Sequence, residues 1–577
     1  MSAHYVIGRL AGAFLVILLA VSVAVRADTR TVPAAGQSAI ATAHPLATEA
    51  GLEVIAAGGN AFDAAVAVSA ALAVVEPYSS GFGGGGFWLI HRASDGFQTM
   101  VDGRERAPLA ARRDMYLGES GEVERALAMN GPMSAGIPGM PAALVHLSGH
   151  YGRLPLGRSL EPAIRLARNG FEVDEIYRRM AAFRLDALRV SPDAAAIFLD
   201  QALKVPAPGA IVRQPELSRT LQMMAREGGA GFYEGETARL LVKGVRDAGG
   251  IWTMRDLASY SVVEREPVRG RYGDMRVVSA SPPSSGGIVL VEMLNILSGF
   301  PVSASGEAAR IHMVSEAMRR AYRDRAQYLG DPDFVEMPRG QLTSPDYAAG
   351  LRAGIRQDRA TPSEALPGVV VLPPGGEDTT HFSIVDAAGN RVSATLSINY
   401  PFGSGFVPPG TGVLLNDEMD DFAAKPGVPN AYGLVGADAN AIEPGKRMLS
   451  SMTPTFLETD ERVAVVGTPG GSRIITMVLL AALDFADGGT VESMVALPRF
   501  HHQYLPDAIE FEPQGFGEKA LTALEAKGHG TRLQDHAWGN MQAVVADRRT
   551  GNVTAASDPR GIGSASVRCL SPVLAAH

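Results

Sequence analysis

The chain has 577 residues, enough for several domains, and its 52 Lys and Arg against 61 Asp and Glu give a formal net charge of −9. This acidic balance and an aromatic content of only 6% argue against a nucleic-acid-binding protein, which needs a basic face and stacking rings. Hydrophobic residues make up 46%, so a large core can form, while the single cysteine, Cys569, excludes an internal disulfide and a cysteine-based zinc site.

The N-terminus has the pattern of an export signal. Arg9 precedes an uncharged apolar run over residues 10–25, and Val25 and Ala27 place small residues at the −3 and −1 positions of a cleavage site. The run is shorter than the roughly 20 residues that span a bilayer. We therefore predict a signal peptide over residues 1–27 and a mature protein in the periplasm or outside the cell. An uncleaved membrane anchor is the alternative interpretation.

The first half of the chain predicts helices alternating with a few buried strands. Residues 46–76 indicate two helices separated at Gly58-Gly59-Asn60, and residues 87–90 and 99–102 indicate strands. Glycines 81 and 83–86 lack the Gly-Lys-Ser/Thr ending of a phosphate loop, so we assign them to close backbone packing. Further helices are predicted at 139–151, 159–169, 215–226, 236–248, 288–297 and 306–328.

The pattern changes after residue 380. Residues 381–386 alternate, a turn follows, and residues 391–399 alternate strictly, which places Ser393, Thr395, Ser397 and Asn399 on one face of a hairpin. Further strand pairs are predicted within 454–467 and 541–557, and helices at 472–486 and 516–527. Strand pairs interleaved with long helices favour stacked sheets that are covered by helices.

Thr379 is the strongest candidate for a chemical role. The sequence contains no Gly-x-Ser-x-Gly elbow, no His-Glu-x-x-His helix and no dinucleotide fingerprint. Thr379 follows a segment rich in proline and glycine, residues 373–376, and an ordinary strand start is the simplest interpretation. If the chain were cut before Thr379, however, that residue would carry a hydroxyl and an α-amine with a pKa of about 7.7–8.0, and thus both nucleophile and general base.

The hairpin supplies possible partners for this threonine. A turn of about four residues places Thr379 opposite Ser397, Ile398 or Asn399. Ser397 and Asn399 share a face, so one of these registers brings both beside Thr379. The sequence leaves the three registers open, because turn geometry sets the pairing.

These residues occur among motifs that resemble the γ-glutamyltransferase (γ-glutamyltranspeptidase) family of the N-terminal nucleophile hydrolase superfamily. The likeness runs from about residue 41 to residue 560. Its motifs are residues 44–48 (HPLAT), 58–61 (GGNA), 102–105 (DGRE), 282–287 (PPSSGG), 379–381 (TTH), 416–422 (NDEMDDF), 450–452 (SSM), 467–473 (GTPGGSR), 498–503 (PRFHHQ) and 558–560 (DPR).

The resemblance implies an autoprocessed enzyme with a four-layer αββα fold, two stacked and mainly antiparallel sheets between helical layers. Thr379 would be the nucleophile, exposed by autocatalytic cleavage of the Asp378–Thr379 bond. The products would be a large subunit, residues 28–378, and a small subunit, residues 379–577, which remain together as a heterodimer.

The resemblance also implies site residues. Ser397 stands where the family usually has a threonine that hydrogen-bonds the nucleophile, and Gly470 and Gly471 would form the oxyanion hole. The other implied contacts are to the γ-glutamyl group: Arg104, Ser450 and Ser451 to its α-carboxylate, and Asn399, Glu418 and Asp421 around its α-amino end.

Residues 425–439 resemble the lid loop of bacterial members, with Tyr432 as the gate, which favours γ-glutamyl substrates over those of lid-less cephalosporin acylases. Two departures from the family pattern, Asp378 before the cut and Tyr400-Pro401 after Asn399, bear on processing and on acceptor preference.

We therefore expect glutathione and similar γ-glutamyl compounds as donors, amino acids or peptides as acceptors, and neither a metal nor an organic cofactor. Two alternatives remain: an acylase of the same fold that acts on glutaryl or cephalosporin side chains, and a periplasmic binding protein for γ-glutamyl compounds that never cleaves itself.

Overall fold

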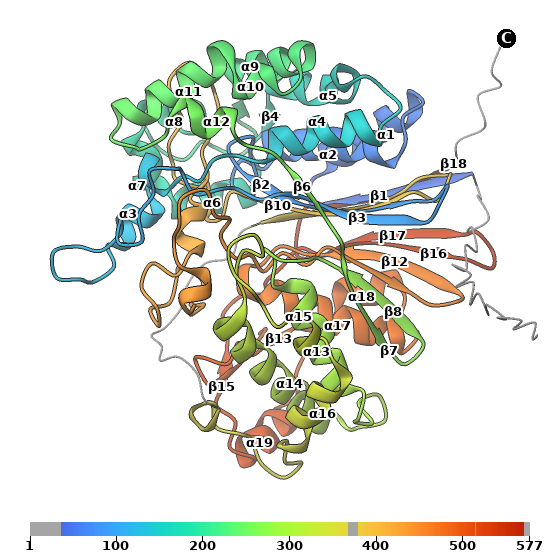
Figure 1. Cartoon of the computed structure of the whole chain (residues 1–577). Helices are drawn as coiled ribbons and strands as arrows, with labels where there is room; N and C mark the ends of the chain where they lie inside the picture. The colour runs from blue at the N-terminus through green and yellow to red at the C-terminus, as the bar shows by residue number, and fades with distance from the viewer. Residues whose placement is uncertain (1–35, 367–378, 514, 570–577) are drawn as a thin grey trace, which may run out of the picture.

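The computed structural model describes residues 36–366, 379–513 and 515–569. Two sheets are stacked face to face in the middle of the molecule, and each outer face is covered by helices (Figure 1). This is the four-layer αββα architecture that the resemblance implied. The predicted signal peptide, residues 1–27, and Asp378 lie outside the described residues.

Both large sheets are antiparallel throughout. The first has the order β18 (Ser564–Cys569), β1 (Gln37–Thr42), β9 (Thr380–Val385), β10 (Arg391–Ser397), β2 (Gly85–Arg92), β3 (Phe97–Gly103) and β6 (Val263–Arg265). The second has the order β17 (Val553–Ser557), β16 (Gln542–Asp547), β12 (Arg462–Gly467), β11 (Thr455–Glu458), β8 (Met275–Ser279) and β7 (Val268–Tyr272).

The helices divide between the two outer layers (Figure 1). The layer on the first sheet contains α1 (Pro45–Ala56), α2 (Ala61–Val75), α4 (Met140–His150), α5 (Leu156–Asn169), α9 (Pro215–Glu227) and α11 (Gly235–Asp247). The layer on the second sheet contains α13 (Gly286–Leu297), α14 (Glu307–Tyr328), α16 (Pro345–Ala353), α17 (Ile474–Ala486) and α18 (Val491–Ala496). The shorter α6 (Glu175–Phe183) and α19 (Glu518–Ala526) lie near the ends of these layers.

Strand β10 shows how the alternating sequence sets the layers. Its apolar residues Val392, Ala394 and Leu396 belong to the core beneath α2, as predicted. Its polar residues face the second sheet, where the Ser393 hydroxyl donates to the Val466 carbonyl at 3.0 Å. The strand is buried on both faces, so its polar face forms hydrogen bonds between the two sheets and does not meet solvent.

Two glycine motifs lie as the sequence predicted, with residues 58–60 separating α1 from α2 and the later glycines packed closely before β2. Asn60 caps α2, because its side chain accepts from the Asp63 N–H at 3.0 Å while the Asp63 carboxylate accepts from the Asn60 N–H at 2.9 Å. The glycines before β2 pack against neighbouring backbone. A Cβ on Gly83 would lie 2.0 Å from the Leu414 carbonyl oxygen, a distance that no side chain tolerates.

The edge strand β18 and its neighbour β1 were not predicted from the sequence. Strand β1 has the sequence QSAIAT, whose small residues carry little strand signal. It forms because it pairs with β9 on one side and with β18 on the other, both from the opposite half of the chain. Its strand character is therefore set by tertiary pairing.

Among the described residues, four strand pairings join the segment before position 367 to the segment after position 378. They are β1 with β9, β1 with β18, β2 with β10, and β8 with β11. A single cut between the two segments would therefore leave both pieces held in shared sheets. Among the described residues, no helix is both long and apolar enough to cross a membrane.

Candidate active site

Thr379 lies immediately before β9 and is almost completely buried. The β9–β10 ladder pairs Thr380 with Leu396, so the next pair along places Thr379 opposite Ser397. This is one of the three registers that the sequence left open. It brings a second hydroxyl to the candidate nucleophile from a rigid central strand.

The polar face of the β9–β10 hairpin has two parts, one that packs between the sheets and one that lies at the candidate site. Thr395 lies 2.8 Å from Nδ1 of His381, and burial lowers the pKa of His381 to about 3, so this pair is a neutral element between the sheets. Ser397 and Asn399 lie at the open end, where the Ser397 hydroxyl accepts from the Asn399 N–H at 2.8 Å. Both residues at this end of the face line a cavity.

Two cavities meet at Thr379. The first, here called the narrow pocket, has a volume of about 20 Å³ and is lined by Arg104, Thr379, Ser397, Asn399, Asp421, Tyr432, Leu434, Ser450, Ser451, Met452, Gly471 and Ile474. The second, here called the wide cavity, has a volume of about 830 Å³ and shares only Thr379 and Tyr432 with the narrow pocket. Thr379 therefore stands where a small cavity adjoins a large one.

Arg104 dominates the charge of the narrow pocket. Its guanidinium lies 2.5 Å from Glu418 Oε2 and 2.5 Å from Asp421 Oδ2, and its side chain is only 1% exposed. Asp102 fixes the backbone at this point, because its carboxylate accepts from the Arg104 N–H at 2.9 Å. The pocket thus holds one buried cation between two carboxylates that come from another segment.

Two carboxyl groups beside Arg104, those of Glu418 and Glu105, have pKa values above their ordinary range. Burial raises the pKa of Glu418 to about 7 against the pull of Arg104. Burial and the neighbouring Glu418 also raise the pKa of Glu105, whose carboxylate lies 3.6 Å from Arg104. At neutral pH the cluster is therefore close to charge balance, and a zwitterionic ligand can enter without adding net charge.

Ser450 and Ser451 lie on a segment that pairs with the loop before α13. The Ser450 N–H donates to the Pro283 carbonyl at 2.9 Å, and the Ser285 hydroxyl donates to the Ser450 carbonyl at 2.7 Å. On the other side of the pocket, the Asn399 side chain donates to the Asp417 carbonyl at 3.0 Å. These hydrogen bonds to backbone carbonyls hold the wall of the narrow pocket in place.

Gly470 and Gly471, the predicted oxyanion-hole residues, adopt backbone conformations with positive φ that favour glycine. Their φ angles are +137° and +55°, and a Cβ on Gly471 would lie 2.4 Å from the Tyr432 ring. Within the described part of the chain, neither glycine uses its main-chain N–H in a hydrogen bond. Both N–H groups are therefore available to a ligand, with Gly471 lining the narrow pocket and Gly470 the wide cavity.

Tyr432 closes the narrow pocket. Its hydroxyl donates to the Asn399 carbonyl at 2.6 Å, and its ring covers Gly471. The loop that carries it is tied down by Asn430, which donates to Asp421 at 3.0 Å, and by the Ala431 N–H, which donates to Asp420 at 2.9 Å. The predicted lid thus rests on the acidic segment that also holds Arg104.

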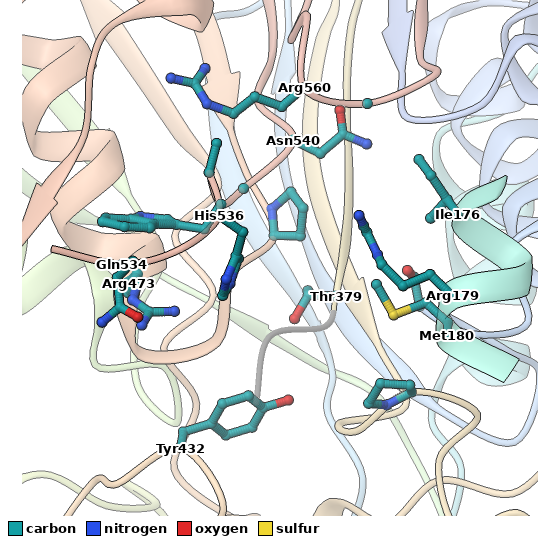
Figure 2. Close-up of a pocket in the computed structure, with 18 of the residues that line it drawn as sticks. Ile176, Arg179, Met180, Thr379, Tyr432, Arg473, Gln534, His536, Asn540 and Arg560 are labelled. Carbon is teal, nitrogen blue, oxygen red and sulfur yellow. The ribbon is translucent and has the colours of Figure 1, made fainter. Parts of the chain in front are cut away.

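The wide cavity has a more exposed, mixed-charge lining. Figure 2 shows Thr379 at its middle, with Arg179 and Met180 of α6 on one side, Arg473 and His536 on the other, and Tyr432 nearby. Glu76 forms part of the wall, where the Thr380 hydroxyl donates to it at 2.6 Å and burial raises its pKa to about 7.

A second titratable cluster lies at the far end of α14. His312, Glu316 and His529 are close enough together to hold a metal ion. Their atoms already bond within the protein: His312 lies 2.7 Å from His529 and 2.7 Å from the Arg356 carbonyl, and Glu316 accepts from Arg320 at 2.6 Å. This network and its adjacent arginine account for the cluster without a bound ion.

Comparison with known proteins identifies the family. The family model described as gamma-glutamyltranspeptidase matches residues 47–568. The chain belongs to the γ-glutamyltranspeptidase family. It is 41% identical over 533 residues to a glutathione hydrolase proenzyme of Escherichia coli, covering 92% of this chain and 91% of that protein.

Two solved structures support the assignment. A cephalosporin acylase from Bacillus halodurans is 29% identical, with a TM-score of 0.80 over 92% of this chain and 95% of that one. A γ-glutamyltranspeptidase from Helicobacter pylori is 38% identical, with a TM-score of 0.55 over 56% of this chain and 93% of that one. The family, the fold and the enzyme class that the motifs implied are thus confirmed.

The structure brings the predicted γ-glutamyltranspeptidase residues together around Thr379. Gly470 lies on the wide cavity, and Glu418 contacts Arg104 from behind the wall of the narrow pocket. The sequence analysis did not single out Glu76, which lines the wide cavity, or Arg325 of α14, which donates to the Ser451 hydroxyl in the wall of the narrow pocket. An isolated acid near a helix end and one arginine among several in α14 carry no local signal of a role.

Proposed function

We propose that the protein is a γ-glutamyltransferase and glutathione hydrolase in which Thr379 carries the γ-glutamyl group as an ester. The observation that carries this proposal is the position of Thr379 between two cavities of different character. The narrow pocket offers Arg104 and buried carboxylates, which match the two charged ends of an α-amino acid. The wide cavity has room for the remainder of the donor and for an acceptor.

Maturation is the first act of the proposed mechanism. The Thr379 hydroxyl oxygen attacks the Asp378 carbonyl carbon, the C–N bond between the two residues breaks, and the α-amine of Thr379 takes up a proton. Water then hydrolyses the resulting ester and leaves a free carboxylate on Asp378. The proenzyme name of the relative supports this step, and the ladders that cross the cut explain how residues 28–378 and 379–577 would stay together.

Donor binding exchanges ion pairs inside the narrow pocket. The donor α-carboxylate pairs with Arg104 and the hydroxyls of Ser450 and Ser451, while its ammonium pairs with Asp421 and Glu418. A volume of about 20 Å³ holds no more than a water molecule. The proposal therefore requires Tyr432 and its loop to move outward as the donor enters.

Turnover uses the free α-amine of Thr379 as general base. The amine accepts the hydroxyl proton as the oxygen attacks the γ-carbonyl carbon, and the N–H groups of Gly470 and Gly471 hold the oxyanion. The amide C–N bond then breaks and the leaving amine takes the proton. Water or the amine of an amino acid or peptide attacks the ester from the wide cavity, which restores the Thr379 hydroxyl.

The proposal includes the location and the second reactants. The N-terminal pattern favours a periplasmic or secreted enzyme, where extracellular glutathione and peptides would supply donors and acceptors. All of the proposed steps use groups of this chain, the two substrates and water.

An acylase of the same fold is the second candidate, because a cephalosporin acylase matches the fold with a TM-score of 0.80. The lid carrying Tyr432 and the paired charges of the narrow pocket favour a donor with both an α-amine and an α-carboxylate. Competition separates the two: glutathione should inhibit hydrolysis of a γ-glutamyl anilide much more strongly than a glutaryl amide does. The reverse order would favour the acylase.

One experiment tests the main proposal. The purified protein is incubated with a γ-glutamyl anilide, and the masses of its chains are measured in the same sample. We expect anilide release together with two chains that meet between Asp378 and Thr379. A fully active protein with an intact chain would contradict the proposal, as would a cleaved protein with no activity on any γ-glutamyl donor.

A further inference from the structure

Arg325 is a buried cation behind the narrow pocket. It lies in the last turn of α14 and is 4% exposed. Its Nη2 donates to the Ser451 hydroxyl at 3.0 Å and its Nε donates to the Ser285 hydroxyl at 2.9 Å. Within the part of the chain that the structure describes, Arg325 forms no ion pair with a carboxylate. Buried arginines are almost always paired, so this one lacks the counterion that its burial calls for.

Other arginines of the same helix show the usual arrangement. Arg320 lies 2.6 Å from Glu316, one turn earlier, and Arg319 pairs with Asp507. Both are also buried. The missing counterion of Arg325 is therefore a property of its position next to the pocket and not of the helix.

The contact with Arg325 fixes the direction in which Ser451 can donate. A guanidinium has five N–H donors and no acceptor, so the Ser451 oxygen must accept from it. No acceptor for the Ser451 hydroxyl hydrogen is found among the described residues, and this side chain lines the narrow pocket. The hydrogen is therefore free to point at a ligand, and the adjacent cation strengthens it as a donor.

The same guanidinium acts on the neighbouring serine through a relay. Ser285 accepts from Arg325 and donates to the Ser450 carbonyl at 2.7 Å. Arg325 thus fixes the backbone of Ser450 and the hydroxyl of Ser451 together. Both serines line the narrow pocket, whereas the guanidinium itself remains outside it.

Arg104 alone is poorly suited to attract an anion. Glu418 and Asp421 each lie 2.5 Å from it and compensate its charge before any donor enters. Arg325 has no carboxylate within ion-pair distance among the described residues, and Asp421 acts on it only from farther away. The positive potential on the side of the pocket formed by Ser450 and Ser451 therefore comes mainly from Arg325, which does not touch the donor.

We propose that Arg325 is a positioning residue that makes the narrow pocket select donors with an α-carboxylate, by polarising Ser451 and anchoring Ser450. This inference rests on the proposed function, since it assigns the serine side of the pocket to the donor carboxylate. The donor carboxylate becomes the counterion of Arg325, with the Ser451 hydroxyl between the two.

The test compares two donors in the mature enzyme: a γ-glutamyl anilide, and the same anilide with its α-carboxylate converted to a carboxamide. The measured quantity is the donor ratio, which is kcat/KM for the carboxylate donor divided by kcat/KM for the carboxamide donor. In Arg325→Gln this ratio should fall by about 10- to 100-fold, mainly through a higher KM for the carboxylate donor, because the lost cation acts on bound carboxylate. Arg325→Lys should restore part of the ratio.

Arg320→Gln is the matched control, because it makes the same change in a buried arginine of the same helix that already has a carboxylate partner. It should leave the donor ratio unchanged even if it lowers the melting temperature. An equal loss on both donors in Arg325→Gln would overturn the inference and mark Arg325 as structural.

Two further variants keep the test decisive. If Arg325→Gln fails to form two chains, Ser285→Ala removes only one anchor of the guanidinium and should still lower the ratio several-fold; no change would overturn the inference. In a Ser451→Ala background, Arg325→Gln should lower the ratio by less than it does in the wild type, because only the route through Ser285 and Ser450 remains; fully additive losses would contradict the proposed contact with Ser451. An inactive wild-type protein would instead contradict the proposed function.

Discussion

The narrow pocket and the wide cavity share Thr379 but recognise ligands by different means. At the narrow pocket the charged groups are buried, and Arg104 pairs with Glu418 and Asp421. The wide cavity has an exposed cation, Arg179, on one side and the Arg473–Glu510 pair on the other. A buried charge interacts strongly with a ligand charge that lies at one fixed position, whereas the interaction of an exposed charge is weakened by water and salt. The protein should therefore be strict about its donor and permissive about its acceptor.

The largest effect is expected where the two cavities meet. Thr379→Ala removes the hydroxyl that both maturation and turnover use in the proposed mechanism. We expect a single uncleaved chain and no measurable release from a γ-glutamyl anilide. Thr379→Ser retains a hydroxyl and an α-amine and should still mature, more slowly. A Thr379→Ala protein that separates into two chains would show that another group attacks the Asp378 carbonyl.

The next largest effect tests the strict side of the comparison. Arg104→Gln leaves the buried carboxylates of Glu418 and Asp421 without their cation and removes the partner of the donor carboxylate. The expected loss in donor binding is about 2–5 kcal/mol, seen as a higher donor KM.

Arg106→Gln is the control for this variant. Arg106 is two residues along the chain and donates to the Gly445 and Ser259 carbonyls, away from the narrow pocket. Its replacement should leave the donor KM unchanged. If the donor KM in Arg104→Gln also stays at the wild-type value, Arg104 does not hold the donor.

Much of this arrangement could be predicted from the sequence, because its signals are local. The strict alternation of residues 391–399 predicted which residues of β10 face the core, and the ladder then brought Ser397 opposite Thr379. The glycines at 83–86 predicted close backbone packing, and the contact between Gly83 and the Leu414 carbonyl confirms it. Family resemblance supplied Arg104 and the two serines, which no periodicity would have selected.

The parts that could not be predicted depend on long-range packing. Strand β1 is recognisable only through its partners β9 and β18. Arg325 resembles the other arginines of α14 in sequence, and it differs from Arg320 only because the helix ends beside Ser451. Glu76 is an ordinary acid at the end of α2 until β9 brings the Thr380 hydroxyl to it. In each case the distinguishing fact is a contact between distant segments.

The pH dependence of stability tests the buried acid in the wall of the wide cavity, Glu76. Burial raises the pKa of Glu76 from 4.5 to about 7, so the folded protein holds a proton that the unfolded chain releases at lower pH. This contribution to stability is complete below pH 4.5 and is lost as the pH rises through 7. Its full size is about 3 kcal/mol.

Glu76→Gln imitates the protonated acid and should abolish this loss. Melting temperatures of the mature wild type and variant should be similar at about pH 5 and should diverge by about pH 8, with the variant higher. Glu234→Gln, at an exposed position, serves as the control and should follow the wild type. Parallel pH profiles for Glu76→Gln and the wild type would show that Glu76 is ionised throughout.

The smallest effect is expected on the permissive side, at Arg179. This cation is exposed on α6 and lines the wide cavity, so it can attract the carboxylate of a peptide acceptor only through screened charge (Figure 2). In Arg179→Ala the KM for a dipeptide acceptor should rise about two- to fivefold at low ionic strength, and the difference should vanish at about 1 M salt.

Arg178→Ala is the matched control, because Arg178 is the preceding residue of α6 and donates to the Pro206 carbonyl and Glu175 instead. The same dipeptide with an amidated C-terminus should not respond to Arg179→Ala. A loss that persists at high salt, or that affects both dipeptides equally, would mean that the wide cavity binds its ligand as strictly as the narrow pocket does.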